Sequence, residues 1–416
     1  MLIIQPHWPP SNLVGVHRVR LIANELHGLG WNATVLAVHE DDYEEELVPE
    51  TTQLVTPEVE VIKVRARPAP KVFGRRLYGD IALRAWRPLM SRASELLQTG
   101  NFDFVWVSLP PWYLALMGGP LFKKHGVPFG VDYRDPWVYN LAPEEKGINR
   151  AMFTLLAARI LEPIALRKSA LITGVSDGYI QGVRDRYPKL LRDTPIQTFQ
   201  MGFARRDHEI PLPEYTVPFT PNKRTYVYAG AHWAMGAPLF RLFLKGLAKA
   251  HKNHVLGGCE FLFIGTGNPA LPSIQDQIEE LDIADVAREI PQRLSYLAVQ
   301  KILRESNGTL VIGSTDAHYS ASKIFQCLIT SPRLMGFFHE DSVGRTVLHN
   351  CTADSYYVPF HSNRTEEEIL AELSDTLTAF INPENDWNAN QEPLESYTAR
   401  NNALAFLGEV ETIIQS

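Results

Sequence analysis

The sequence predicts an α/β protein of two Rossmann-like, doubly wound domains, because short apolar runs alternate with amphipathic stretches through both halves of the chain. In the first half, Leu2–Ile4 and Thr34–Val38 have strand length and flank a helical pattern that ends at Gly30. In the second half, Thr225–Ala229 and Glu260–Ile264 flank another helical pattern. Strand–helix–strand units of this kind build parallel sheets, and two of them in tandem imply a cleft between two domains.

Composition excludes several classes of protein. With 416 residues, 45% of them hydrophobic and 21% charged, the chain has the make-up of a globular protein rather than a disordered one. A formal net charge of −7 argues against a general nucleic-acid binder. The three cysteines have no metal-ligand spacing and lie in or beside apolar runs, so we expect small core residues in a reducing compartment. There is no secretory signal and no apolar run of about 18 residues, which predicts a cytoplasmic protein.

A proline-rich stretch sets the expected domain boundaries. Residues 205–224 carry many charges and four prolines without periodicity, which is typical of a linker. We therefore expect a first domain over 1–205, a linker over 206–221 and a second domain over 222–390. The remaining strands are expected at Phe104–Val107, Phe129–Val131, Ala170–Val175, Thr198–Met201, Leu310–Ile312, Arg333–Phe338 and Tyr356–Phe360. Further helices are expected near Ala151–Arg167, Ser295–Arg304, Ser322–Ile329 and Thr365–Ile381, with Asn149 and Thr365 as N-caps.

One apolar run ends abruptly in charge. It begins at Val127 with β-prone residues and stops at a proline, just after Asp132, Arg134 and Asp135. Ligands of open α/β sheets collect outside the carboxyl ends of parallel strands, so these charged side chains are candidates for a site. The alternative is an Asp–Arg pair that merely ties a loop, and the residues alone do not separate the two.

The loop before the first helix is a second candidate. Gly15 permits close approach to the helix N-terminus, where backbone N–H groups and the helix dipole favour an anion. The phosphate-binding pattern G-x-G-x-x-G is missing from this loop, which disfavours a dinucleotide-dependent dehydrogenase.

The segment Lys63–Arg92 is unusually basic. It has nine lysines and arginines against one aspartate, and apolar residues are interleaved with them. A basic amphipathic stretch of this kind suits an anionic membrane surface or a phosphorylated acceptor, and it adds peripheral association with the inner membrane face to the expected localisation. The alternative is a solvated helix face that balances the acidic Glu44–Glu46 region.

Several motifs together resemble the retaining family 4 glycosyltransferases of GT-B fold, and the resemblance spans nearly the whole chain. The motifs are the loop Pro9–Gly15 leading into Arg18–Leu26, the strand end Asp132-Tyr-Arg-Asp-Pro-Trp137, the turn Met201-Gly-Phe203, and the segment Ser295–Phe338 with its Ser322-Lys-Ile-Phe-Gln-Cys-Leu328. In such chains the first domain is the acceptor side, and residues 391–416 would form a closing helix that crosses back to it.

The resemblance implies transfer of a sugar from a nucleotide-diphosphate donor to a hydroxyl acceptor with retention at the anomeric carbon, without a cofactor or a metal. The acceptor would be a glycan, a lipid-linked molecule or a small molecule. Lys323 would stabilise the departing diphosphate from a helix start, where the helix dipole adds positive potential. The alternative is an exposed surface lysine. Arg134 and Asp135 would bind the sugar hydroxyls and orient the reacting centre.

The chain departs from this family at two places. Gln326 stands where many members carry a ribose-binding glutamate. Residues Ala231–Gly236 replace a stretch that usually holds two cations for the diphosphate, and His232 within it is either a phosphate donor or a neutral loop histidine. Arg18 or Arg345 would compensate for the lost charge. Two rivals stay open: a sugar-nucleotide epimerase or phosphorylase of similar fold, and a degenerate, non-catalytic member that acts as a partner protein.

The resemblance distributes the candidate residues over two ligands. For the nucleotide-sugar donor they are Gly15, Gly230, His232, Gly265, Asp316, Lys323, Gln326 and Arg345. For the acceptor they are His17, Arg18, Trp112 and Trp137. The alternatives are that both tryptophans are buried structural residues, and that Asp316 is an ordinary polar loop residue.

Overall fold

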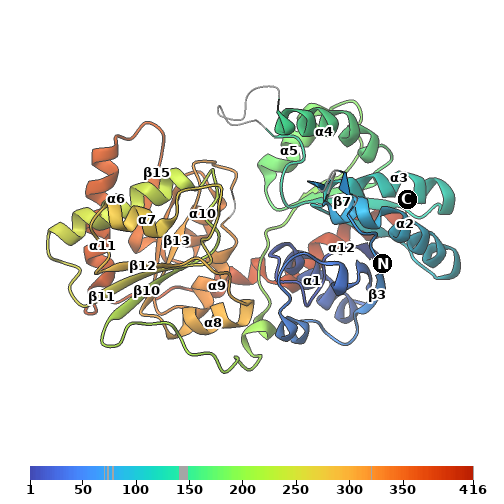
Figure 1. Ribbon diagram of the computed structural model, residues 1–416. Helices are drawn as coiled ribbons and strands as arrows, with labels where there is room; N and C mark the ends of the chain where they lie inside the picture. Colours follow the sequence, from blue (N-terminus) through green and yellow to red (C-terminus); the bar gives the residue numbers. More distant parts are fainter. Residues whose placement is uncertain (70, 73–74, 77–78, 140–148, 320, 416) are drawn as a thin grey trace. The chain divides into compact units, whose positions relative to one another are not determined.

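The structure, a computed structural model, describes residues 1–69, 71–72, 75–76, 79–139, 149–319 and 321–415. It divides into two compact units: unit 1 comprises Met1–Ala204 and Tyr397–Ser416, and unit 2 comprises Arg205–Ser396 (Figure 1). The segment 206–221, expected to be a linker, belongs to unit 2. The carbonyls of Pro213 and Pro218 there accept hydrogen bonds from Lys301 and Arg288.

Unit 1 is built on a parallel sheet. In the described residues its seven strands have the order β3-β2-β1-β6-β7-β8-β9. The strands are β1 (Leu2–Ile4), β2 (Thr34–Val38), β3 (Glu60–Val64), β6 (Val105–Leu109), β7 (Phe129–Tyr133), β8 (Leu171–Gly174) and β9 (Ile196–Thr198). β9 thus begins two residues before the strand expected at 198–201. The order reverses direction at β1 and β6, which creates a topological switch point between them.

Helices cover both faces of this sheet, which explains why β1 is apolar along its whole length. Leu2 and Ile4 belong to the same core as α2, whereas Ile3 belongs to the core of α1 and α12. The helices of unit 1 are α1 (Gly15–Leu26), α2 (Ile81–Thr99), α3 (Gly118–His125), α4 (Arg150–Leu166), α5 (Asp177–Arg186) and α12 (Ala399–Gln415). The closing segment therefore packs within unit 1, and Asn149 caps α4 as expected, accepting a hydrogen bond from the backbone N–H of Met152 at 3.0 Å.

Unit 2 repeats the design. Its six described strands have the order β12-β11-β10-β13-β14-β15, and the switch point lies between β10 and β13. The strands are β10 (Arg224–Ala229), β11 (Cys259–Ile264), β12 (Ala287–Ile290), β13 (Gly308–Ile312), β14 (Leu334–His339) and β15 (Tyr357–Phe360). The helices are α6 (Ala237–Lys252), α7 (Ile274–Glu280), α8 (Tyr296–Glu305), α9 (Lys323–Thr330), α10 (Val343–Asn350) and α11 (Glu366–Ile381). The capping box of Thr365 and Glu368 at the start of α11 is confirmed.

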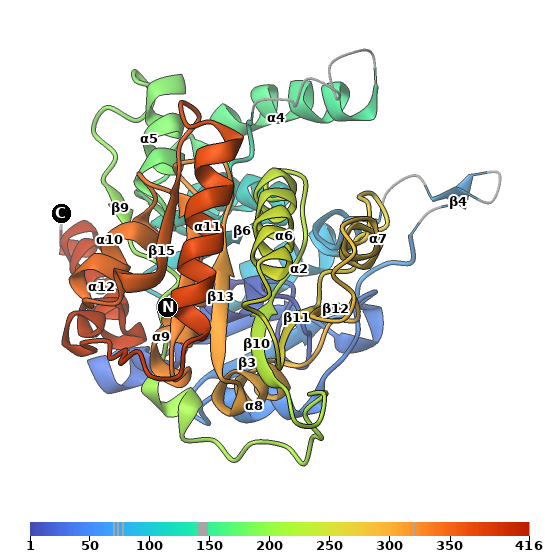
Figure 2. The same cartoon turned by 90° about the vertical axis from the view of Figure 1, so that its left-hand side faces the viewer.

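Helices also cover both faces of the second sheet. α6 and α11 lie side by side on one face, and α8 and α9 lie on the other (Figures 1 and 2). Cys259, Cys327 and Cys351 are buried and free, as expected of small core residues. Among the described helices, none is both long enough and apolar enough to cross a membrane.

Candidate functional site

The charged end of β7 lies beside the switch point of unit 1, but its members differ in what they can do. Asp132 is fully buried, and both of its carboxylate oxygens accept hydrogen bonds from Arg18, at 2.7 and 2.8 Å. Thr173 donates to Asp132 as well, at 2.7 Å. Arg18 gives its remaining terminal nitrogen to the carbonyl of Phe199 at 2.8 Å and lies over the ring of that residue. This is a complete ion pair inside unit 1.

The placement of Arg18 corrects its assignment to the acceptor and to a compensating role for the donor. Its side chain is 1% exposed, and its guanidinium is occupied by Asp132 and a backbone carbonyl. A buried arginine that is already paired has no donor left to offer a ligand without breaking that pair. For Arg18 and Asp132, the alternative of a pair that ties the fold is the one that the geometry fits.

Arg134 and Gly15 are brought together, as a common site would require. The Arg134 guanidinium donates to the carbonyls of Leu109 and Pro110. A Cβ on Gly15 would lie only 1.5 Å from its Nη1 atom, so a side chain at this first residue of α1 would displace the Arg134 guanidinium. Burial lowers the pKa of Arg134 to about 10, opposed by the nearby charges of Asp132 and Asp135. The group stays cationic at neutral pH and lies against the positive end of a helix, an arrangement that an anionic ligand would stabilise.

Asp135 and the two tryptophans surround the same strand end. Asp135 keeps contact with solvent, although burial by the surrounding protein raises the pKa of its carboxyl, partly offset by Arg134. The rings of Trp112 and Trp137 are stacked with centroids 6.3 Å apart and planes 9° apart. Trp137 is buried and belongs to the core, whereas Trp112 is partly exposed. The structural alternative therefore fits Trp137, and Trp112 is the one of the pair that a ligand can reach.

Lys323 has unusual surroundings in unit 2. It is the first residue of α9, and its Nζ atom is buried with less than 1 Å² of accessible area and no hydrogen-bond partner among the described residues. The atom lies 3.6 Å from the centroid of the Tyr228 ring. A Cβ on Gly230 would lie 2.3 Å from it, so the lysine can occupy this niche only while residue 230 has no side chain. Burial lowers the pKa of Lys323 to about 7. The surface-lysine alternative does not fit this geometry.

His232 lies in the loop after β10, two residues beyond Gly230. Its side chain is buried, its ring meets the ring of Phe240 edge-on at 5.0 Å, and its Nε2 has no partner in the described part of the chain. Burial lowers its pKa, so the neutral form dominates at neutral pH. This placement favours the neutral loop histidine of the two alternatives, although a neutral imidazole still has one N–H to donate.

The loop after β13 approaches the loop after β10 within unit 2. The hydroxyl of Ser314 donates to the carbonyl of Met235 at 3.3 Å, and the rings of Trp233 and Tyr319 lie 5.0 Å apart. Asp316, in this loop, accepts a hydrogen bond from the backbone N–H of His318 at 2.9 Å. The structure thus gathers Gly230, His232, Asp316 and Lys323 around the switch point of the second sheet.

Three other donor candidates have local roles. Gly265 follows β11 with a φ of +74°, and a Cβ placed on it would meet no atom closer than 3.9 Å, so its backbone conformation accounts for the glycine. The Oε1 atom of Gln326 accepts a hydrogen bond from Gln300 at 2.8 Å. Arg345 forms an ion pair with Asp354 at 2.7 Å and lies over the ring of Tyr357, so the structure does not support it as a substitute for the missing cations.

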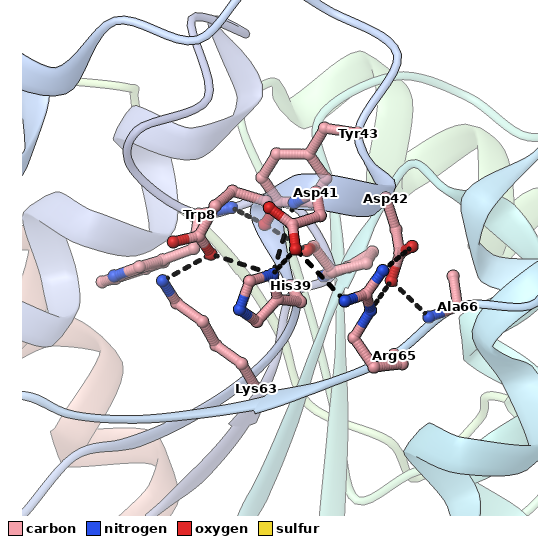
Figure 3. Close-up of polar contacts among 10 residues, drawn as sticks. Trp8, His39, Asp41, Asp42, Tyr43, Lys63, Arg65 and Ala66 are labelled. Atoms are coloured by element: carbon pink, nitrogen blue, oxygen red, sulfur yellow. Dashed lines mark hydrogen bonds and ion pairs between the residues drawn. The ribbon is translucent and has the colours of Figure 1, made fainter.

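The basic segment 63–92 is not one amphipathic helix, because it is divided among β3, the short antiparallel ladder of β4 (Lys71–Val72) and β5 (Arg75–Arg76), and α2. Figure 3 shows how two of its cations are neutralised. Lys63 lies 2.7 Å from Glu40, and Arg65 donates to both carboxylate oxygens of Asp42, at 2.8 and 2.9 Å. Arg84 lies 3.3 Å from Glu44. For these cations the alternative of charge balance with the adjacent acidic stretch is the better interpretation. Residues 70, 73–74 and 77–78 of the segment lie outside the described residues.

Part of unit 1 is similar in sequence to a known domain family. Residues 15–192 match the glycosyl transferase 4-like domain. No curated protein matches the sequence of this chain. The matched part contains Gly15, Arg134, Asp135 and Trp112, whereas Lys323 and the other unit 2 residues lie outside it.

Solved structures extend the likeness to the whole chain at the level of fold. The pneumococcal O-GlcNAc transferase GtfA, in complex with UDP and GlcNAc, has a TM-score of 0.60 at 11% identity, with 100% of this chain and 99% of that chain covered. Sucrose-phosphate synthase from Thermosynechococcus elongatus has a TM-score of 0.55 at 11% identity, covering 100% and 96%. HepE from Anabaena, in complex with UDP-glucose, has a TM-score of 0.53 at 12% identity, covering 100% and 96%. The chain therefore has the GT-B type of α/β fold, which consists of two Rossmann-like units.

Sequence reasoning missed one polar cluster in unit 1. His7 follows β1, and its Nδ1 lies 2.7 Å from Oε1 of Glu45, which also accepts a hydrogen bond from Ser11. Burial alone would raise the pKa of Glu45, but these contacts outweigh it and lower that pKa to about 2. His17, the remaining acceptor candidate, is partly exposed in the first turn of α1, where its Nδ1 lies 3.4 Å from Arg20. A histidine three residues after the first strand was the available signal, because the same edge of the sheet carries the other candidates.

Proposed function

We propose that this protein is a glycosyltransferase that moves a sugar from a nucleotide-diphosphate donor to a hydroxyl acceptor with retention at the anomeric carbon. The match of residues 15–192 and the GT-B fold of the chain support glycosyl transfer from a nucleotide sugar. The observation that carries the proposal is the buried Nζ atom of Lys323, at the start of α9 and beside Gly230, which has no hydrogen-bond partner among the described residues.

An anion is the ligand that would complete the niche of Lys323. A buried polar group without a partner is unfavourable, and a buried ammonium more so. A diphosphate would bring about two negative charges to a lysine at a helix N-terminus, where the helix dipole acts in the same direction. As the bond to the sugar breaks, charge grows on the diphosphate, so the lysine contributes more to the transition state than to ground-state binding.

In unit 1, Arg134 and Asp135 bind the sugar hydroxyls and orient the reacting centre. Trp112 and His17 are the acceptor candidates that remain accessible once Arg18 and Trp137 are assigned to the core. As the sugar–diphosphate bond breaks and the new glycosidic bond forms, an oxygen of the departing diphosphate takes the proton of the acceptor hydroxyl, so neither Asp135 nor His7 has to remove it. The acceptor itself, whether glycan, lipid-linked molecule or small molecule, is left open by the proposal.

A panel of nucleotides and nucleotide sugars tests the proposal. Thermal shifts with UDP, GDP, ADP and their glucose forms identify the donor, and release of free sugar or transfer to added acceptors reports activity. Lys323→Ala should lower turnover by roughly 10- to 150-fold, the equivalent of one hydrogen bond to an ionised partner. Arg345→Ala is the matched control, because its charge is already paired with Asp354. Full activity in Lys323→Ala would show that the diphosphate is bound elsewhere. Failure of every nucleotide to bind would favour the degenerate, non-catalytic alternative, and interconversion of the donor sugar would favour an epimerase.

A further inference from the structure

Helix α4 of unit 1 carries an apolar stripe that nothing in the described part of unit 1 covers. Phe153, Leu156, Ile160 and Ile164 are 58%, 53%, 56% and 58% exposed. At about 100° per residue these four side chains fall within roughly 80° of one another around the helix axis, so they form a single ridge. α4 lies at the periphery of unit 1 in both views (Figures 1 and 2).

Rotation of α4 about its axis would not bury the ridge without exposing other residues, because the opposite face of the helix already packs in the core of unit 1. Leu155, Ala158 and Ala165 are buried in the core of unit 1. Glu162, on the same inner face, is fully buried and accepts hydrogen bonds from Tyr133 and from Arg186. A helix that is apolar on its outer face as well as its inner face calls for a second apolar environment.

Four exposed cations border the ridge. Arg159 lies on α4 beside the ridge, Arg167 and Lys168 follow its last turn, and Lys189 lies in the loop after α5. None of these four side chains makes an ion pair or a side-chain hydrogen bond within the residues that the structure describes. Ile164, Arg167 and Lys189 also line a pocket of about 580 Å³ at the end of the ridge. This cationic rim stands in a chain whose net charge is −7.

We propose that this surface, the α4 ridge with its cationic rim, docks unit 1 onto an anionic lipid bilayer. Large apolar side chains enter the interfacial region while arginine and lysine at the rim meet lipid phosphates, which is how amphipathic helices bind in the plane of a membrane. The pocket at the end of the ridge gives one phosphate headgroup a place next to Arg167 and Lys189. A second copy of the chain fits less well, because ridge-on-ridge pairing about a two-fold axis would bring the unpaired cations of both rims together. The basic segment 63–92, in contrast, has several of its cations paired internally.

Vesicle flotation tests the proposal with the intact chain. Vesicles of phosphatidylcholine alone and vesicles with 30% phosphatidylglycerol, roughly the anionic content of an acidic membrane surface, are compared at low and high salt. The wild-type chain should bind the anionic vesicles at least tenfold more tightly, with affinity falling as salt rises, because exposed charges are screened within about 10 Å at 0.1 M ionic strength. The triple variant Phe153→Ser, Leu156→Ser, Ile160→Ser should lose at least tenfold in affinity. The triple variant Arg159→Gln, Arg167→Gln, Lys189→Gln should lose the preference for anionic lipid.

Two controls distinguish loss of vesicle binding at the ridge from general effects of the substitutions. Leu404→Ser removes an apolar side chain that is 48% exposed on α12 of unit 1 and should leave vesicle binding unchanged. Melting curves of each variant identify any that fail to fold, and the charge variant stays informative because its residues are exposed. Equal binding to both kinds of vesicle, absence of binding by the wild-type chain, or unchanged binding by the serine variant would each overturn the proposal. A concentration-dependent dimer that the serine variant abolishes would assign the ridge to a second copy instead.

Discussion

Arg18 in unit 1 and Lys323 in unit 2 are both cations placed beside aromatic rings at a switch point, but only Arg18 has a counter-charge within the described residues. Arg18 meets both oxygens of Asp132, at 2.7 and 2.8 Å, and a backbone carbonyl of Phe199. The Nζ atom of Lys323 meets no hydrogen-bond acceptor among the described residues and lies against the ring of Tyr228. The described residues thus supply partners for the Arg18 guanidinium, whereas they supply no hydrogen-bond acceptor for the Lys323 amine.

That difference separates a structural role from a functional one. A buried charge that is fully paired inside the fold contributes to the integrity of that fold and has little left for a ligand. A buried polar atom without a partner is rare in native proteins and calls for a reason, such as a ligand that completes it. Arg134, next to the paired Asp132, is an intermediate case: its guanidinium donates to the carbonyls of Leu109 and Pro110, and it also lies against the N-terminus of α1.

The largest expected effect comes from breaking the pair of Arg18. Arg18→Leu leaves Asp132 buried with Thr173 as its remaining side-chain donor among the described residues. Removal of one partner of a buried ion pair destabilises a protein by about 3–5 kcal/mol, because the other charge stays in the interior. Urea unfolding at neutral pH should show this loss in the transition of unit 1.

Arg65→Leu is the contrast within the same unit. As Figure 3 shows, Arg65 also meets both oxygens of an aspartate, Asp42. Its side chain, in contrast to that of Arg18, is 62% exposed. Asp42 is only 10% exposed, but it keeps the hydrogen bond from the backbone N–H of Ala66 at 2.8 Å, and water replaces the contacts of the exposed arginine. The loss should therefore stay within about 1 kcal/mol. If Arg18→Leu keeps its stability and instead loses ligand binding, the assignment of Arg18 to the fold is wrong.

The next effect has the opposite sign. Lys323→Met fills the same niche with an apolar side chain and should stabilise unit 2 by about 1–4 kcal/mol at neutral pH, while it weakens nucleotide binding and so reduces the thermal shift that the nucleotide produces. Because the folded pKa of about 7 lies below the ordinary lysine value of 10.5, the penalty for burying the amine is complete below pH 7 and fades as the pH rises toward 10.5. Melting curves at pH 6 and pH 9.5 should therefore show a larger gain at the lower pH. A destabilised Lys323→Met variant would mean that the ammonium has a partner inside the fold.

Nucleotide affinity should itself depend on pH through the same group. Only the protonated amine attracts the diphosphate, and burial holds the pKa of Lys323 near 7 in the free protein. Affinity should thus be level well below pH 7 and fall by about tenfold for each pH unit above it, until the raised pKa of the complex is reached. Calorimetry in buffers of different ionisation enthalpy should detect proton uptake on binding near pH 8. The Lys323→Met variant, with its weak residual binding, should show a flat profile over the same range.

Features that depend on residues close together in the sequence could be predicted from it, whereas features that depend on distant residues could not. β1, β2 and β10 were predictable because a strand buried on both faces must be continuously apolar, and the sequence displays that run directly. β3 and β12 were missed because they are edge strands, in which polar residues such as Glu60 and Arg288 interrupt the apolar pattern.

The sequence predicted where the candidate site lies, but it did not predict which of its charged residues are paired with each other. Charge at the end of an apolar run revealed the strand end with Asp132, since the pattern is local. The partner of Asp132 is 114 residues away, and no spacing in the sequence links it to Arg18. The niche of Lys323 depends in the same way on Tyr228 and Gly230, which come from a different strand end. Motifs therefore locate an edge of a sheet, whereas the pairing of each charge follows from tertiary packing.

The smallest change in nucleotide affinity is expected from Gly230→Ala, which moves the amine of Lys323 but leaves the lysine in place. In Gly230→Ala the new Cβ would lie 2.3 Å from the Nζ atom of Lys323, the mobile end of a flexible side chain, so the amine should be displaced toward solvent. Its pKa should rise toward the ordinary value, and the break near pH 7 in nucleotide affinity should disappear. Binding at pH 7 should change by only a few-fold, because the charge is retained and only its position is lost.

Gly265→Ala is the control for backbone strain, because Gly230, with a φ of +155°, and Gly265 both adopt backbone conformations that favour glycine. Gly265 has a φ of +74°, so alanine there costs about 1–2 kcal/mol, but no atom lies closer than 3.9 Å to the added Cβ and Lys323 keeps its niche. Titrations of both variants with the same nucleotide from pH 6 to pH 9 separate the two causes. The Gly265→Ala profile should keep its break near pH 7, and the Gly230→Ala profile should lose it. If both variants lose the break equally, strain in the loops is responsible, and the niche does not set the protonation of Lys323.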